Sequence, residues 1–159
     1  MTRTHLSKDS EIIIQRRDQP EKADAKPCGF WYSVDGDWER WCREEQAAWI
    51  QGCKAHEVTL GDERIMEIRT AFDLDLFHEK YHSEVDSPWG PYIDWWRVAE
   101  DFDGIEIAPY QWSRGLNGVV SRWYYGWDCA SGCVWRPKGI RVRLAAQRPP
   151  PAAKGRRGK

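Results

Sequence analysis

The chain has 159 residues, a net charge of -1, 11 tryptophans and 5 cysteines. This length is typical of one domain, since domains cluster near ~100–150 residues, and we expect a single globular unit over residues 1–145. The balanced charge excludes a global electrostatic field for nucleic acid or membranes, and no apolar run reaches the ~18 residues that cross a bilayer.

Cysteine usage and the start of the chain indicate a cytoplasmic protein. The cysteines are odd in number and form no CxxC motif, which favours reduced thiols over a disulfide framework. The first residues lack the apolar core of a signal peptide. Cys129 and Cys133 could act as a metal-binding pair, but no second pair has suitable spacing, so we expect no metal site.

Strand and helix patterns alternate along the first part of the chain. Residues 3–7 and 29–34 have the branched and aromatic content of strands. From Trp38, apolar residues recur at helical spacing up to Gly52, and the preceding DGD motif offers an aspartate for the helix start. We expect the tryptophans of this helix to form one buried stripe, made of Trp38, Trp41 and Trp49.

The middle of the chain predicts a hairpin and two helices. Residues 56–60 and 64–68 alternate in polarity, which indicates two paired strands or one strand and its extension. Residues 73–85 predict a helix with Asp73 as its cap, and residues 93–102 predict another. The expected buried positions are Leu74, Phe77 and Tyr81 in the first helix, and Trp95, Val98, Ala99 and Phe102 in the second.

The last part of the chain predicts strands and a basic tail. Ile105 and Ile107 flank Glu106, so a strand here buries both isoleucines and turns Glu106 to the other face. Residues 122–129 and 139–144 predict two more strands. Residues 146–159 are rich in proline, lysine and arginine, and we expect a disordered tail that could contact nucleic acid. The pattern predicts an α+β fold with mixed, mainly antiparallel sheets and three short helices.

Three sequence motifs, which we expect on separate strands, resemble the motifs of a known protein superfamily. A histidine lies in THLS, an aromatic pair and a serine follow in KPCGFWYS, and a glutamate lies in FDGIEI, with WYYGWDCASGCVW further on. In their order these motifs resemble the ADP-ribosyltransferase-like superfamily, in particular small phage and bacterial members, over Arg3 to Leu144. The resemblance implies a split-sheet core and transfer of ADP-ribose from NAD to a macromolecule, protein or nucleic acid. Such a protein would be an effector acting in the cytoplasm, that of the host cell if phage-encoded.

The resemblance also implies roles for five residues. Cleavage of the C–N glycosidic bond builds positive charge on the ribose, and Glu106 is the candidate carboxylate that stabilises this charge. Trp31 or Tyr32 would stack on the nicotinamide, Ser33 would support its strand and touch the ribose, and His5 would anchor the distal ribose or the phosphates. A Rossmann-type site is excluded because the chain has no GxGxxG motif.

The sequence departs from the family pattern at two places. Arginine-modifying relatives carry a second acid two residues before the catalytic glutamate, where this chain has Gly104, so modification of arginine is not expected. The glycine that often follows the histidine is also missing. Asp101 and Asp103 are back-up carboxylates, although turn residues after a helix explain them equally.

Ordinary structural roles and other functions stay open. Glu106 would be a surface residue of a half-buried strand, His5 a polar residue near the terminus, and the Trp31–Tyr32 pair part of the core. The main alternative function is a non-catalytic, Trp-rich module of phage or prophage origin that binds nucleic acid or a protein partner, with Trp89 and Trp112 as stacking platforms. A cysteine hydrolase that uses Cys129 or Cys28 has no supporting signature.

Overall fold

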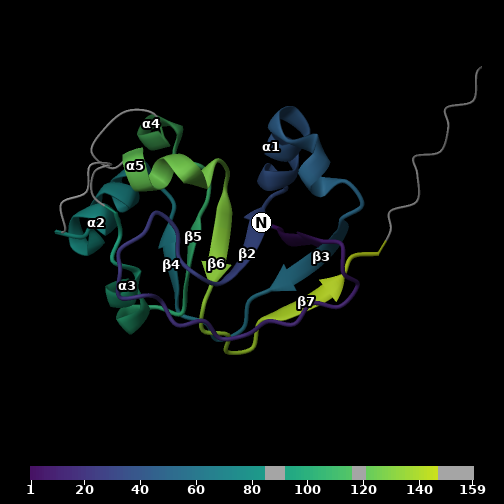
Figure 1. Ribbon diagram of the computed structural model, residues 1–159, viewed down its shortest axis with the longest axis horizontal. Helices are drawn as coiled ribbons and strands as arrows, with labels where there is room; N and C mark the ends of the chain where they lie inside the picture. Colours follow the sequence, from purple (N-terminus) through teal and green to yellow (C-terminus); the bar gives the residue numbers. More distant parts are fainter. Residues whose placement is uncertain (85–91, 116–120, 147–159) are drawn as a thin grey trace, which may run out of the picture.

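The computed structural model describes residues 1–84, 92–115 and 121–146, and these form an α+β architecture (Figure 1). One mixed sheet of seven strands runs in the order β4-β5-β6-β2-β1-β3-β7. The strands are β1 (Arg3–Ser7), β2 (Phe30–Val34), β3 (Lys54–Thr59), β4 (Ile65–Ile68), β5 (Gly104–Ile107), β6 (Ser131–Val134) and β7 (Arg141–Leu144). The helical segments are α1 (Asp37–Glu45), η1 (Ala47–Ile50), α2 (Ala71–Tyr81), α3 (Trp95–Asp101), α4 (Trp112–Gly115), α5 (Ser121–Tyr124) and η2 (Tyr125–Trp127).

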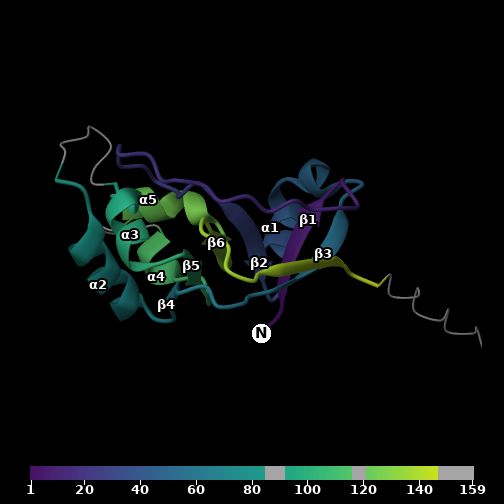
Figure 2. The same ribbon diagram turned by 90° about the horizontal axis from the view of Figure 1, so that it is seen from below.

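The expected α+β class and antiparallel character are confirmed at this level. Strands β4 and β5 are parallel, and each other neighbouring pair of these strands is antiparallel. Figure 2 shows β1, β3 and β7 at one end of the sheet, and β4, β5 and β6 with α2, α3 and α5 at the other. No helix of the described residues is long and apolar enough to span a membrane. The expected tail of residues 146–159 and the Trp89 loop lie, apart from Ala146, outside the described residues.

The hairpin predicted around residues 61–63 is wrong. Strand β3 lies between β1 and β7, whereas β4 lies at the opposite edge of the sheet beside β5. The turn between them is held by the segment before β7, because the Glu63 carboxylate accepts hydrogen bonds from the backbone N–H groups of Lys138 and Ile140 at 2.6 and 2.7 Å. The alternating pattern predicts each strand correctly but says nothing about its partner.

The strand predicted at residues 122–129 is also wrong, since this segment forms α5 and η2. Aromatic residues suit a strand, but Trp123, Tyr124 and Trp127 follow the i, i+1, i+4 spacing that places three rings on one side of a helix. All three rings are buried in the core. The strand in this region is β6, which begins four residues after Trp127.

The buried stripe predicted for α1 is corrected as well. Cys42 is the buried residue of this helix, Trp38 and Trp41 are half-buried, and Trp49 in η1 is 57% exposed. The helix begins after Gly36, which has a φ of 70°, and no side chain caps it. A helical period identifies one side of a helix but cannot tell whether another element covers that side.

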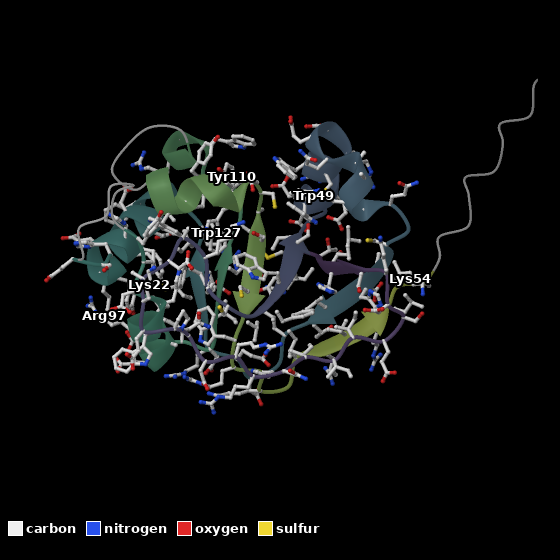
Figure 3. All side chains as sticks on the ribbon, in the orientation of Figure 1. Lys22, Trp49, Lys54, Arg97, Tyr110 and Trp127 are labelled. Atoms are coloured by element: carbon white, nitrogen blue, oxygen red, sulfur yellow. The ribbon has the colours of Figure 1, made fainter. Side chains whose placement is uncertain are left out.

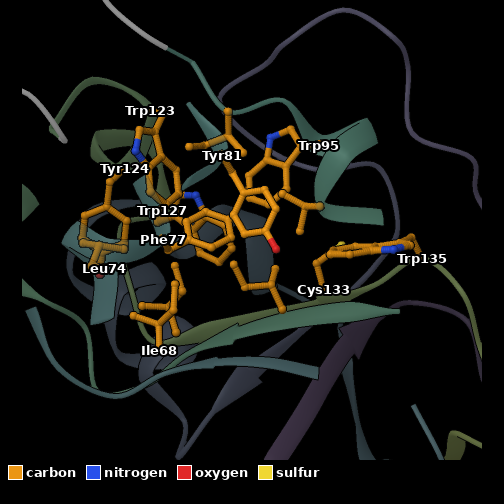
Figure 4. Close-up of a cluster of buried hydrophobic side chains, with 14 residues drawn as sticks. Ile68, Leu74, Phe77, Tyr81, Trp95, Trp123, Tyr124, Trp127, Cys133 and Trp135 are labelled. Atoms are coloured by element: carbon orange, nitrogen blue, oxygen red, sulfur yellow. The ribbon is translucent and has the colours of Figure 1, made fainter. Parts of the chain in front are cut away.

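The main core lies between one face of the sheet and α2, α3 and α5. Figure 4 shows the rings of Phe77, Tyr81, Trp95, Trp123 and Trp127 gathered over the strands. Helix α2 is fixed by a capping box in which Thr70 is the N-cap and Asp73 the N3 residue, so Asp73 takes part in the cap from inside the helix. The predicted buried positions Leu74, Phe77 and Tyr81 are confirmed.

The opposite face of the sheet carries a smaller core around Tyr32. Gly132 lies between Tyr32 of β2 and Glu106 of β5 in one cross-strand row. Because Gly132 has no side chain, the Tyr32 ring lies across it and its hydroxyl donates to Glu106 Oε2 at 3.0 Å. A Cβ atom on Gly132 would collide with the Tyr32 ring.

We therefore predict that Gly132→Ala lowers the free energy of unfolding by about 1–3 kcal/mol through overpacking. For a chain of this size, each kcal/mol lowers the Tm by about 2–4 °C. The matched control is Gly126→Ala, whose Cβ would meet only Lys26 Cε at an ordinary 3.6 Å. Equal thermal unfolding of both variants would contradict the assigned position of the Tyr32 ring.

Candidate functional site

The candidate site is a cleft that opens where β1 and β2 part. Their ladder consists of two pairs, Arg3 with Val34 and Thr4 with Ser33. Beyond it, His5 Nδ1 hydrogen-bonds the carbonyl oxygen of Trp31 at 2.8 Å, so an imidazole bridges the two strands in place of the backbone. The cleft at this point has a volume of about 320 Å³, and its lining includes Trp38 of α1 and Trp127 and Cys129, which follow α5. It is called the tryptophan cleft below.

Three indole rings line the tryptophan cleft, those of Trp31, Trp38 and Trp127. The Trp31 and Trp127 rings meet edge to face at 5.0 Å, and the ammonium of Lys26 lies 5.6 Å from the centroid of Trp31. Trp127 also belongs to the main core, and Figure 3 shows it between α5 and the sheet, across from Trp49 beside α1. This wall is therefore rigid, aromatic and positively charged at one side.

The indole N–H of Trp127 is a buried donor with no hydrogen-bond acceptor among the described residues. A buried polar group without a partner costs roughly 1–3 kcal/mol. Buried polar groups are nearly always satisfied in folded proteins, so this unpaired donor, on a ring that lines the cleft, is an exception that a bound ligand or water would explain.

Polar groups occupy the side of the cleft next to α1. The Ser33 hydroxyl donates to Glu39 Oε2 at 2.7 Å and accepts from the backbone N–H of Trp38 at 3.1 Å. The Glu39 side chain is half-buried, and its carboxylate is thereby held beside a residue that lines the cleft. Asp37, two residues earlier, fixes the same helix by accepting from the backbone N–H of Ala130 at 2.7 Å.

A second acid, Asp128, lies between the lining residues Trp127 and Cys129. Its backbone has a φ of 60°, which is unusual for a residue other than glycine. Burial raises the pKa of its carboxyl group, and the charge of Lys26 partly offsets this effect. A strained, half-buried acid with a raised pKa beside a cleft is the kind of group that active sites collect.

The surroundings of His5 favour its neutral imidazole. Burial, and to a smaller extent the nearby His56, lower the pKa of its imidazole, while the bond to Trp31 works in the opposite direction. Because a carbonyl oxygen can only accept, Nδ1 carries the proton and Nε2 keeps a lone pair. In the neutral imidazole, Nε2 can therefore accept a hydrogen bond from a ligand hydroxyl, and the anchoring role of His5 stays a prediction.

Glu106 does not line the tryptophan cleft. Strand alternation turns it to the opposite face of the sheet, where its side chain has 0% exposure. Arg3 holds the carboxylate through two contacts, Nε–Oε2 at 2.6 Å and Nη2–Oε1 at 3.2 Å, and Arg69 Nη2 lies 2.9 Å from Oε1. With the Tyr32 hydroxyl, these groups form a closed cluster around the anion, called the Glu106 cluster below.

The structure thus brings together four of the five predicted residues. His5, Trp31, Tyr32 and Ser33 line one cleft, although the Tyr32 ring turns to the Glu106 face. The expectation that Glu106 reaches the same ligand is corrected, because Arg3, Arg69 and Tyr32 enclose its carboxylate. The alternation around Glu106 is confirmed, but Glu106 is buried and not a surface residue.

The two back-up carboxylates have structural partners. Asp101 accepts from the hydroxyl of Tyr81 and pairs with Lys80. Asp103 is buried and binds Arg136 and Lys138. Burial raises the pKa of the Asp103 carboxyl, but these hydrogen bonds and that of the Arg64 N–H outweigh it and keep the pKa below its usual value.

The sequence motifs do not identify Lys26 and Trp127, which line the cleft, or Glu39 and Asp128, which lie next to lining residues. The helical spacing predicts Trp38 as part of a buried stripe and gives no sign that Glu39 pairs with Ser33. The available signal was that α1 starts directly after the strand that carries Ser33, so its first turn must lie at the end of that strand. Within the described residues, no group of three histidine, cysteine or acidic side chains could hold a metal ion.

Comparison of the chain with protein-family models, curated proteins and solved structures finds no match.

We predict that Glu106→Gln lowers the free energy of unfolding by about 3 kcal/mol, because it leaves the partly buried guanidinium of Arg3 without its counter-charge and that of Arg69 with the exposed Glu67 alone. The matched control is Glu67→Gln on β4, which removes a 55% exposed carboxylate 3.1 Å from the same Arg69 and should cost less than about 1 kcal/mol. Denaturant unfolding measures both. Equal losses would show that the Glu106 cluster does not stabilise the fold.

We predict that Cys129 resists alkylation at pH 8, whereas the exposed Cys28 reacts. Burial, more than the neighbouring acids, raises the pKa of the Cys129 thiol to about 12, so the nucleophilic thiolate is scarce at pH 8. Mass spectrometry after a short exposure to iodoacetamide identifies the modified residues. Rapid modification of Cys129 in the folded protein would contradict this prediction and would make Cys129 a candidate nucleophile.

Proposed function

We propose that the protein is an NAD-dependent ADP-ribosyltransferase that modifies a macromolecule and binds NAD in the tryptophan cleft. The observation that carries this proposal is the convergence of His5, Trp31, Tyr32 and Ser33, from two strands separated by a long connector, on that one cleft. The parting of β1 from β2 after two residue pairs supports a split-sheet core of the ADP-ribosyltransferase type.

The lining of the cleft matches the parts of a dinucleotide. Its volume of about 320 Å³ lies within the range of about 300–1,000 Å³ that is usual for small-molecule sites. The nicotinamide would stack against Trp31 or Trp38 and place its carboxamide oxygen on the unsatisfied indole N–H of Trp127. Lys26 would pair with a phosphate, and His5 Nε2 would accept from a ribose hydroxyl.

The chemistry needs an anion next to the ribose and an acceptor for a proton. As the bond between the nicotinamide nitrogen and ribose C1′ breaks, its electron pair leaves with nicotinamide and positive charge builds on the ring. We assign stabilisation of this charge to Glu39, which Ser33 holds in place at 2.7 Å. The nucleophile of the acceptor then bonds to C1′, and Asp128, whose pKa is raised by burial, takes its proton.

Glu106 is a positioning residue in this proposal. On the sheet face opposite the cleft, its contact with the Tyr32 hydroxyl fixes the position of β2, and its contact with Arg3 fixes the position of β1. These two strands are the ones that part to form the cleft. Glu106 therefore supports the geometry of the site from the opposite face of the sheet without touching the ligand.

The alternative is a non-catalytic binding module, and the exposed tryptophans favour it. Trp49, Trp96 and Trp112 are 57%, 49% and 72% exposed, which suits stacking on nucleobases or contacts with a protein partner. A module of this kind would bind single-stranded nucleic acid in a salt-dependent way, or a protein, and would leave NAD intact.

The proposal predicts nicotinamide release from NAD in the presence of a cell lysate, with transfer of labelled ADP-ribose to a macromolecule. Glu39→Gln should lower the rate by about 10²–10³-fold, the usual loss when one electrostatic contact to a transition state is removed, and should leave the Tm close to that of the wild type. Chromatography of released nicotinamide and circular dichroism provide the two readouts.

The matched control is Glu79→Gln, an exposed glutamate on α2 away from the cleft, which should keep full activity. Absence of nicotinamide release by the wild-type protein, with salt-dependent binding of single-stranded DNA, would favour the binding module. Release that is unaffected by Glu39→Gln would contradict the assignment of the acid.

A further inference from the structure

Three tryptophans on α1 and η1 form an exposed aromatic surface, called the tryptophan platform below. Trp38 and Trp41 stack with a centroid distance of 5.0 Å and an interplanar angle of 11°. Trp49 packs against both, at 5.9 Å and 5.8 Å, and is itself 57% exposed. Grouped aromatic rings that a fold leaves open usually mark an interaction site.

The chain itself brings a suitable segment to this platform. Strand β7 pairs with β3 so that Leu144 lies opposite His56, and the N–H of Ala145 donates to the carbonyl of Ala55 at 2.9 Å. Ala145, two residues before this segment, therefore lies beside the start of β3, and residues 51–53 alone separate that strand from η1, which carries Trp49. Figure 1 shows the end of β7, the start of β3 and α1 on the same side of the molecule.

The sequence of this segment suits an aromatic platform. Residues 149–151 are three consecutive prolines, which favour the polyproline II conformation, and aromatic surfaces bind this conformation at low entropic cost. At about 3.1 Å per residue, the chain covers roughly 9 Å from Ala146 to Pro149 in this conformation, so the prolines follow closely on the end of β7.

Charge supports the same pairing. Residues 147–159 contain two lysines and three arginines, Arg148, Lys154, Arg156, Arg157 and Lys159, and no acid. Next to the platform, Glu44 and Glu45 at the end of α1 are exposed and have no ion-pair partner within the described part of the chain, and Arg43 is the one basic residue beside them in the sequence. A basic segment is therefore attracted to this end of α1.

We propose that residues 147–159 bind the tryptophan platform of the same molecule. Pro149–Pro151 lie against the rings of Trp41 and Trp49, and the basic residues that follow face Glu44 and Glu45. This contact does not depend on NAD or on any reaction. Since Trp38 belongs both to the platform and to the cleft, the bound segment borders the mouth of the cleft.

The test uses the full chain with ¹⁵N-labelled tryptophan, and it follows the indole N–H signals by NMR. Replacing the three prolines by serine, or Lys154, Arg156, Arg157 and Lys159 by glutamate, should move the Trp41 and Trp49 signals. Those of the buried Trp95 and Trp123 should stay in place. Assignment comes from single Trp→Phe variants, and Lys22→Glu, an exposed basic residue at the other end of the molecule (Figure 3), is the control that should move neither signal.

A second readout is the rate of trypsin cleavage after Arg156 and Arg157, which Trp49→Ala should raise several-fold if the platform protects this segment. Trp41 and Trp49 signals that are the same in the wild type and both variants would overturn the proposal. Signal positions that change with protein concentration would overturn it as well, because a second copy would then supply the segment. Neither readout involves NAD, so both outcomes are independent of the proposed activity.

Discussion

The structure depends on one buried anion and the groups that neutralise it. Glu106 has 0% exposure, and it contacts Arg3 of β1, Tyr32 of β2 and Arg69 beyond β4. A carboxylate is tolerated in a protein interior when charged and hydrogen-bonding partners surround it, and removal of one partner is costly. The Glu106 cluster therefore joins four strands of the sheet from the face opposite the cleft, and it fixes the first strand of the chain to the fifth.

This constraint explains why a cleft exists. Arg3 and Thr4 bind β1 to β2, and the next residue, His5, inserts its ring between the two strands and bonds to Trp31. Where strands part, backbone and side chains become available to a ligand, and the rigid aromatic core supplies a wall through Trp127. The three indole rings suit a flat ligand and Lys26 suits an anionic group, whereas Glu39, held by Ser33, supplies a negative charge beside the cleft.

Local patterns in the sequence predicted what depends on local structure. The alternation around Glu106, the buried face of α2 and the strand at residues 30–34 are all set by neighbouring residues, and they are confirmed. The burial of Glu106 could not be predicted, because it depends on an arginine 103 residues away. The partner of β3 and the exposure of Trp49 likewise depend on which element covers a given edge or face. The periodicity of apolar residues does not show which strand pairs with β3 or whether another element covers Trp49. The strand predicted at residues 122–129 is wrong for another reason, since the aromatic residues of this segment occur in helices as well as in strands.

The central claim is that NAD binds where β1 and β2 part. The most direct measurement is a crystal structure of the protein with an NAD analogue whose glycosidic bond cannot break. The account predicts the nicotinamide ring against the indoles of the tryptophan cleft, its carboxamide oxygen on the Trp127 N–H, and the ribose beside Glu39. A dinucleotide bound on the other face of the sheet, next to an opened Glu106 cluster, would contradict it, as would an empty cleft at saturating concentration.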